Sequence, residues 1–275
     1  MPKPLGYVHR EPQSPLDGNL AMTSTHEALV TDQFGPRAAA YVTSVVHAQG
    51  ADLEELVALV RGHDKARVLD LGCGGGHVGF YVAPHVREVV AYDLSEEMLR
   101  AVAGTARERG LDNVVTQCGA AEKLDMPDAS FDFVFSRYSA HHWSDVGAAL
   151  REARRVLAPG GKVVFIDVVA PKLPLFDTFL QSIELLRDPS HGRNYSAMEW
   201  QALLRAAGFT PGHTSARRLR LEFASWIARI RTSDLHAQAI RSLQTMTSRE
   251  VKDYFEIEPD GSFTLDTMSF TAEPA

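Results

Sequence analysis

The sequence has little cysteine, no long apolar run and no excess of positive charge. Its 275 residues include two cysteines, Cys73 and Cys118, which are too few for a disulfide framework and are typical of a reducing compartment. No apolar run approaches the roughly 20 residues that a transmembrane helix needs. The net charge of −7 gives nucleic acid no general electrostatic attraction. We therefore expect a cytoplasmic protein with no membrane span and no nucleic-acid partner.

The N-terminal residues, MPKPLGYVHREPQSPLDGNLA, are rich in proline and lack the apolar core of a signal peptide. We expect a disordered arm over residues 1–25, and Met22 leaves open whether residues 1–21 are a native part of the protein. Apolar residues then recur at spacings of three and four from Val30 to Tyr41, and residues 53–60 follow a second helical pattern. Residues 26–62 are therefore predicted to form a helical cap.

Strand-like and helical segments alternate from residue 67 onward. The predicted strands are residues 67–71, 89–92, 114–118, 133–135 and 163–169. One intervening helix has Ser95 as its N-cap and Glu96 and Glu97 in its first turn. Such alternation indicates an α/β fold with a Rossmann-like, doubly wound and mostly parallel sheet. Further strands at 219–223 and 263–270 complete a seven-stranded sheet in one domain over residues 63–275.

Two segments of this domain depart from the alternation. A polar stretch, DPSHGRNY at 188–195, interrupts two helical patterns, so residues 171–195 are predicted to form a lid. Ser196 and Glu199 have the spacing of a capping box that opens the next helix. Residues 224–256 are mostly helical and are predicted to be an insertion.

A glycine-rich turn follows the first strand, in the sequence VLDLGCGGGH at 68–77. Glycines let the backbone approach a ligand closely, and a helix start offers free N–H groups to an electron-rich partner. Asp93 follows Gly72 by 21 residues, at the end of the second strand, where a carboxylate can accept hydrogen bonds from ribose hydroxyls. These features predict a cofactor that contains adenosine.

The spacing of the glycines helps to choose the cofactor. Gly72, Gly74 and Gly76 read G-x-G-x-G, whereas a dinucleotide site reads G-x-G-x-x-G. Asp70 stands two residues before this loop; its charge would repel a pyrophosphate and attract an ammonium or a sulfonium group. A positively charged ligand is therefore favoured over NAD.

Four segments carry a family resemblance: VLDLGCGGGH, AYDLSEEML, GAAEKLDMPDASFDFVFS and VLAPGGKVVFID. They follow one another as in class I S-adenosylmethionine-dependent methyltransferases, and the resemblance spans about Phe34 to Phe209. The chain is most similar to the small bacterial enzymes related to quinone-biosynthesis (ubiquinone/menaquinone) C-methyltransferases. The resemblance implies an S-adenosyl-L-methionine cofactor and in-line transfer of its methyl group to a small-molecule acceptor.

The resemblance also implies which residues contact the cofactor. Asp70 and the backbone at Gly72 and Gly74 would hold the methionine part. Asp93 would bind the ribose, Leu94 and Met98 would contact the adenine, and the N–H of Ala121 would donate to an adenine nitrogen. The backbone carbonyl of Arg137 would contact the amino group, and Tyr41 would close over the cofactor. The sequence departs from the family at Ala120, where relatives usually have Asp; Glu122 is a candidate to compensate.

Candidate catalytic residues lie in SRYSAHHW at 136–143 and in the predicted lid. Tyr138 and His142 follow the fourth strand, at the sheet edge where ligands bind in such folds, and His191 lies in the polar stretch. Adjacent histidines do not project to the same side of a helix or strand, and no other ligands are spaced for a metal, so no metal is expected. A neutral imidazole suits a base near pH 7, and His142 is preferred over His141. A purely structural role for either histidine stays open.

Other functions also stay open. An S-adenosylmethionine-binding protein that transfers no methyl group would share the same glycine loop. An NAD-dependent oxidoreductase is disfavoured by the glycine spacing, and an RNA- or protein-modifying enzyme by the acidic balance. The sequence does not choose between carbon, oxygen and nitrogen as the methyl acceptor, nor does it indicate an oligomeric state.

Overall fold

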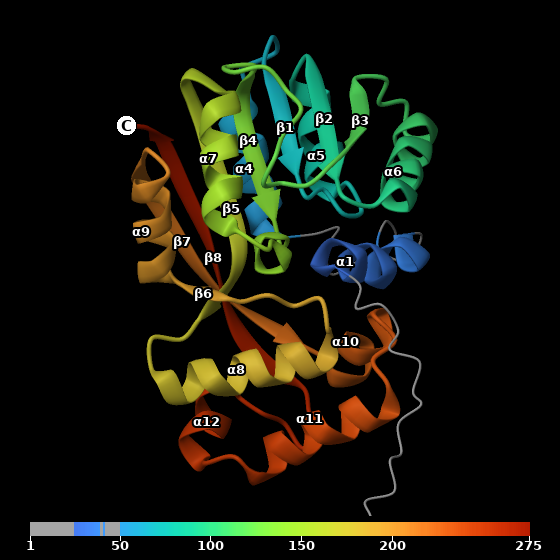
Figure 1. Cartoon of the computed structure of the whole chain (residues 1–275), viewed down its shortest axis with the longest axis vertical. Helices are drawn as coiled ribbons and strands as arrows, with labels where there is room; N and C mark the ends of the chain where they lie inside the picture. Colours follow the sequence, from blue (N-terminus) through green and yellow to red (C-terminus); the bar gives the residue numbers. More distant parts are fainter. Residues whose placement is uncertain (1–24, 39–40, 42–49) are drawn as a thin grey trace, which may run out of the picture.

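The computed structural model describes residues 25–38, 41 and 50–275 (Figure 1). The predicted arm over residues 1–25 thus lies almost wholly outside the described residues, as does the stretch 42–49 of the predicted N-terminal helix. What is described of that region is α1 (His26–Phe34), the 3₁₀ helix η1 (Gly35–Arg37), Ala38 and Tyr41.

Within the described residues, seven strands form one sheet in the order β3-β2-β1-β4-β5-β8-β7. Their bounds are β1 Arg67–Leu71, β2 Glu88–Asp93, β3 Val114–Cys118, β4 Phe131–Arg137, β5 Leu157–Ala170, β7 Phe209–Leu221 and β8 Phe263–Pro274. The first five are parallel, and β8 runs antiparallel between β5 and β7. A two-residue strand, β6 (Tyr195–Ser196), pairs with β5. The predicted Rossmann-like, mostly parallel seven-stranded sheet is confirmed.

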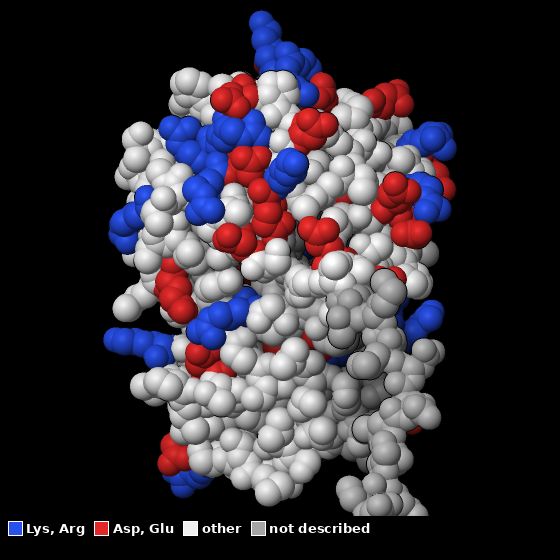
Figure 2. All heavy atoms as spheres, viewed as in Figure 1, with Lys and Arg blue, Asp and Glu red and all other residues white. Residues whose placement is uncertain are grey.

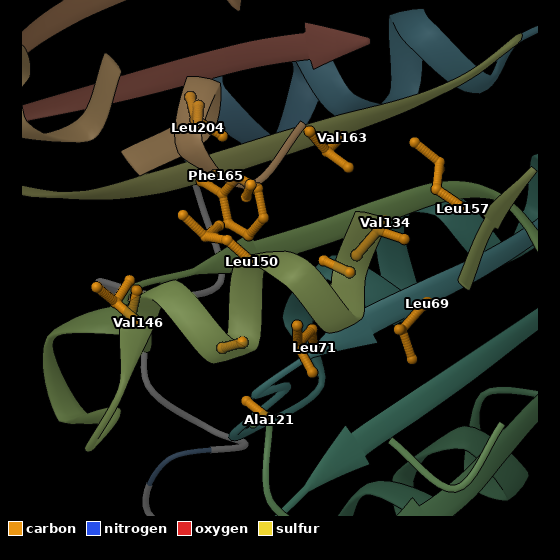
Figure 3. Packing of buried hydrophobic residues seen from close by; sticks show 14 of the residues in the cluster. Leu69, Leu71, Ala121, Val134, Val146, Leu150, Leu157, Val163, Phe165 and Leu204 are labelled. Atoms are coloured by element: carbon orange, nitrogen blue, oxygen red, sulfur yellow. The ribbon is translucent and has the colours of Figure 1, made fainter. Parts of the chain in front are cut away.

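Helices cover both faces of this sheet because the inner strands are apolar on both faces. In β1, Val68 packs with α4 (Ala51–Val60) and α5 (His77–Val82), and α6 (Glu96–Glu108) adjoins α5. Its neighbour Leu69 packs on the opposite face with α7 (Val146–Val156) and α9 (Ala197–Ala206). Figure 3 shows the cluster on this opposite face, in which Leu150 of α7 lies beside Phe165 of β5. Alternation with a period of two thus produces the three layers.

A second core lies beyond the ends of the parallel strands. It holds α8 (Pro174–Arg187), α10 (Phe223–Arg229), α11 (Asp234–Met246) and α12 (Arg249–Tyr254), which form the lower layer in Figure 1. The long strands β7 and β8 connect this second core to the sheet. Phe263 and Leu265 of β8 pack in the second core, whereas Phe270 and Ala272 pack on the sheet face that α7 and α9 cover. Over the described part of the chain, no helix has the length and apolar character needed to cross a membrane.

The strand predicted at residues 219–223 is only the end of β7, and Phe223 already begins α10. Most of β7 is half-exposed, so its sequence shows no apolar run, and its pairing with β8 makes it a strand. Other elements match more closely, including β1 and β3, whose bounds agree with the predicted ones. Ser95 caps α6, since its side chain accepts from the Met98 N–H, and the capping box of Ser196 and Glu199 is formed.

Candidate active site

The glycine loop joins β1 to α5 and is tied to β2. The N–H groups of Gly72 and Cys73 both donate to the carbonyl of Tyr92, at 2.8 and 2.9 Å. Gly72 and Gly74 have φ angles of +67° and +48°, which favour glycine. A Cβ on Gly72 would collide with Oγ of Ser139, whereas a Cβ on Gly74 would meet no atom within 4 Å. The loop is therefore packed at Gly72 and faces open space at Gly74.

Two carboxylates flank this loop, the half-buried Asp93 and the buried Asp70. Oδ2 of Asp93 accepts from the Gly74 N–H at 2.8 Å and Oδ1 from the Ser95 N–H at 3.0 Å, so one side chain connects the loop to the start of α6. Burial raises the pKa of Asp93. Asp70 accepts from the Gly79 N–H at 2.9 Å, and its burial, with the nearby Asp93 charge adding to it, raises the pKa of Asp70 to about 7. This arrangement favours a positively charged ligand.

All nine residues predicted to bind the cofactor line one cavity. They are Tyr41, Asp70, Gly72, Gly74, Asp93, Leu94, Met98, Ala121 and Arg137. The described N-terminal residues cover this cavity, because His26, Val30 and Phe34 of α1 also line it. Figure 1 shows α1 between the sheet layer and the lower helical layer. The Tyr41 carbonyl is 2.9 Å from Nε2 of His77, which fixes its backbone beside the first turn of α5.

The segment after β4 brings two histidines and a tyrosine to the same cavity. Tyr138 has a φ of +54°, an uncommon value for a non-glycine residue and one often found at functional sites. His141 lies with Nδ1 2.6 Å from Oδ1 of Asp167 on β5, and its backbone N–H approaches the other carboxylate oxygen at 3.3 Å. His142 lies with Nδ1 3.0 Å from the carbonyl of Ser190. All three residues line the cavity.

Proteins similar to this chain include methyltransferases. A methyltransferase domain family matches residues 69–165. YcgJ of Bacillus subtilis, an uncharacterised methyltransferase, is 38% identical over 223 residues, which are 81% of this chain and 88% of YcgJ. The crystal structure of YcgJ has a TM-score of 0.78, at 34% identity, over 82% of this chain and 99% of that chain. The chain belongs to the class I S-adenosylmethionine-dependent methyltransferases.

Two further relatives place this methyltransferase within the family. YafE of Escherichia coli, an uncharacterised protein, is 47% identical over 204 residues, which are 74% of this chain and 99% of YafE. A demethylmenaquinone methyltransferase of Listeria welshimeri is 29% identical over 154 residues, 54% of this chain and 65% of that protein. The predicted relation to the quinone methyltransferases is confirmed.

The cavity fits S-adenosylmethionine, the cofactor of the family. The cofactor carries a sulfonium and an ammonium group, and the buried Asp70 and the half-buried Asp93 supply carboxylates beside the open side of Gly74. Leu94, Met98 and Ala121 supply an apolar wall for an adenine. When bound, the cofactor supplies an electrophilic methyl group. The individual contacts stay predictions.

Contacts with neighbouring residues limit which atoms of Arg137 and Glu122 are available to the cofactor. The side chain of Arg137 is buried against Asp52, with Nε 2.5 Å from Oδ2, so only its backbone is placed for the predicted contact. Glu122 lines the cavity near Ala120, but its Oε1 accepts from the N–H and the hydroxyl of Ser144, each at 2.8 Å. Its other oxygen is the one available to replace the missing aspartate.

His191 does not line the cavity of the methyltransferase, contrary to its predicted place on the substrate side. Its Nε2 is 3.0 Å from Oε1 of Gln181 on α8, and its ring lies 5.7 Å from that of His141. Burial, together with the nearby His141 and His142, lowers the pKa of His191 to about 2. The polar stretch 188–195 of the predicted lid thus lies outside the cavity lining, whereas Glu184 and Arg187 of α8 belong to it.

Sequence reasoning missed four charged residues of the site. Asp167, the partner of His141, carried a signal, because it is an acid within the apolar strand VVFIDVV. Glu184, Arg187 and Arg229 line the cavity from the second core, and nothing in their local sequence marks them. Among the described residues, no group of three or more His, Cys, Asp or Glu side chains is arranged to bind a metal ion.

Proposed function

We propose that this methyltransferase acts on a small-molecule acceptor and that His141, oriented by Asp167, is its general base. The acceptor would occupy the part of the cavity that Val168, Leu219, Leu221, Trp226 and Leu265 line. These walls come from β5, β7, β8 and α10, and α1 covers the same cavity. Such a covered, apolar space suits a small molecule. On the face of the molecule shown in Figure 2, positive and negative side chains are interspersed.

The contact between His141 and Asp167 carries the catalytic part of the proposal. An Nδ1–H that donates to the carboxylate leaves the Nε2 lone pair of a neutral imidazole available. Within the described chain Nε2 of His141 has no hydrogen-bond partner, and the residue lines the cavity. Burial acts against the imidazolium, but the Asp167 carboxylate, together with Glu184 and Asp188, outweighs it, and the net pKa of His141 is raised. A base with such a pKa is suited to work near neutral pH.

His142, the base favoured by the sequence, is less suited to that role. Burial and the adjacent His141 lower its pKa to about 4, so it is a weak proton acceptor. Its carbonyl lies 2.8 Å from Nε2 of His26, and its ring lies 4.9 Å from that of Phe34. We assign His142 to the wall that joins the catalytic segment to α1. Tyr138, whose hydroxyl bonds the Thr267 side chain, is assigned to orienting the acceptor.

In this proposal, His141 and Asp167 have separate roles in removing the proton of the acceptor. His141 would take the acceptor's proton at Nε2, and Asp167 would stabilise the resulting imidazolium. Such a base is needed for a phenol, a carbon acid or a protonated amine. The cap over residues 26–62 and the lid over residues 171–195 would both exclude water, since α1 and α8 both contribute to the lining. Free thiols at Cys73 and Cys118 support a cytoplasmic location.

Transfer of a labelled methyl group tests the proposal against a binding-only function. The protein is incubated with methyl-deuterated S-adenosylmethionine and, separately, with the small-molecule, RNA and protein fractions of a bacterial extract. We expect a labelled product in the small-molecule fraction alone, with S-adenosylhomocysteine formed in equal amount and none formed by Asp93→Ala. Binding of the cofactor without any labelled product, or label in RNA or protein, would contradict the proposal.

A further inference from the structure

Two arginines line the part of the cavity that the second core provides, and each is the last residue of its helix. Arg187 ends α8 and Arg229 ends α10. The Arg187 Nε–H donates to the carbonyl of Trp226 at 3.1 Å, and its guanidinium carbon lies 4.9 Å from the centre of that ring. Its Nη1 is 3.8 Å from Oε2 of Glu184, a distant ion pair. Arg187 therefore keeps donors available while its stem and one N–H are fixed.

Arg229 is half-buried and has no hydrogen bond or ion pair within the described chain. A guanidinium group stays charged in proteins and presents five N–H donors. To leave such a group partly desolvated without an anion is costly. Its burial and the nearby Arg187 both oppose the charge, which lowers the pKa of Arg229. The protein thus holds an unpaired cation against the wall of its substrate cavity.

The carboxylates nearby do not neutralise this pair. Glu184 lines the same part of the cavity, and Arg187 and His141 both act against the burial that raises its pKa. Its charge also favours the Arg229 guanidinium, but its ion pair is with Arg187 rather than with Arg229. Asp188 is buried outside the lining and accepts from the N–H and hydroxyl of Ser190, at 2.9 and 2.6 Å. The phenol of Tyr41 faces both arginines and is neutral. The part of the lining that the second core provides therefore contains two guanidinium groups and one carboxylate.

The walls beside the arginines are apolar. Leu219 and Leu221 of β7, Leu265 of β8 and Trp226 of α10 line the same part of the cavity. A ligand that satisfies these walls and the arginines has an apolar body and an anionic group that accepts paired N–H donors. Guanidinium groups match carboxylates and phosphates in this way.

We propose that the acceptor is a small organic acid, bound by Arg229 and Arg187 through an anionic group separate from the atom that is methylated. The apolar body lies along Leu219, Leu221 and Trp226, and the nucleophilic atom faces His141. The inference rests on the proposed function, because it names the substrate class for the same cavity. It makes Arg229 a specificity-determining residue.

Matched pairs of acids and neutral amides test the inference by calorimetry. The probes are 4-hydroxybenzoate with 4-hydroxybenzamide, 3-phenylpropionate with 3-phenylpropionamide, and phenyl phosphate, each titrated into protein saturated with S-adenosylhomocysteine. We expect at least one acid to bind about tenfold or more tightly than its amide, as for a charge-assisted hydrogen bond. Phenyl phosphate shows whether the anion is a phosphate or a carboxylate.

The variant Arg229→Gln should abolish this preference, and Arg249→Gln should preserve it. Arg249 is the matched control, because its side chain is 90% exposed on α12 and the two variants change net charge equally. Equal binding of acids and amides, or an unchanged preference in Arg229→Gln, would overturn the inference. The inference and the proposed function fail in different ways. If the protein binds S-adenosylhomocysteine but shows no preference for acids, only the substrate class is wrong. If the protein does not bind S-adenosylhomocysteine, the proposed function is wrong, and titration of the free protein with the same probes then tests the preference for acids.

Discussion

Nδ1 of His141 lies 2.6 Å from Oδ1 of Asp167, and the two side chains are 16% and 3% exposed. The pair faces opposing effects on its charge, since burial disfavours the imidazolium and the carboxylate favours it. Asp167, with weaker contributions from Glu184 and Asp188, outweighs burial, so the net pKa of His141 is raised.

Asp167→Asn should therefore move the acidic limb of the pH profile. In the wild type, kcat at saturating cofactor and acceptor should rise with pH through a pKa above 6.5, because His141 must be deprotonated to act. Without the Asp167 carboxylate, burial is opposed only by the weaker effects of Glu184 and Asp188, and the limb should shift to lower pH. Steady-state rates between pH 5 and 9 measure the limb. An unchanged limb would show that His141 is not the base.

His141→Gln should slow turnover much more than His142→Gln does. General base catalysis contributes about 10²–10⁴-fold, so a loss of that order is expected for His141, with cofactor affinity retained. His142→Gln removes a wall residue and should mainly change KM for the acceptor. Single-turnover rates with calorimetric binding separate the two effects. The reverse ranking of the two variants would return the role of base to His142.

Asp70→Asn should stabilise the free protein and weaken cofactor binding. The pKa of Asp70 is raised to about 7 by burial, compared with about 3.9 in an unfolded chain. Its contribution to stability is present below pH 4 and is lost as pH rises through 7. Asn carries no charge and can still accept from the Gly79 N–H. Its Tm at pH 8 should therefore exceed that of the wild type.

The same carboxylate should make cofactor affinity depend on pH. In the wild type, S-adenosylmethionine should bind more weakly as pH falls below about 7, because the cation then displaces a proton from Asp70. Asp70→Asn should bind more weakly at pH 8 and lose this dependence on pH. Calorimetry at pH 5.5, 6.5 and 8 gives both trends. Parallel pH dependence in the two proteins would remove Asp70 from the cofactor site.

Alanine at Gly72 and at Gly74 should have different effects. Both glycines have positive φ, which costs a residue with a Cβ about 1–2 kcal/mol. A Cβ at Gly72 also collides with Ser139, so Gly72→Ala should lower the free energy of unfolding further. At Gly74 the Cβ enters open space within the cavity, so the fold should persist and cofactor binding should fail. Chemical denaturation and calorimetry distinguish these losses.

The parts of the fold and site set by local chemistry were predictable from the sequence. The glycine loop, Asp93 and the Ser95 cap lie along the consecutive elements β1, α5, β2 and α6, where spacing along the chain fixes their positions. The sheet class followed from alternation alone. These are the features on which the choice of cofactor depended.

The remaining features depend on contacts between distant segments. The first part of β7 has little apolar patterning and is held by β8, more than 50 residues later. The base could not be chosen from HHW alone, because Asp167 raises the pKa of one histidine, and burial lowers that of its neighbour. His191 lies near both histidines but its ring bonds Gln181, behind the cavity. The roles of the three histidines therefore depend on residues that are close in space but distant in the sequence.

A crystal structure of the protein with S-adenosylhomocysteine bound tests the account most directly. The account predicts ribose hydroxyls on Asp93, adenine between Leu94 and Ala121, and the sulfur directed toward Nε2 of His141. It would be contradicted by adenine in the part of the cavity that Leu219 and Trp226 line, or by a sulfur directed away from His141.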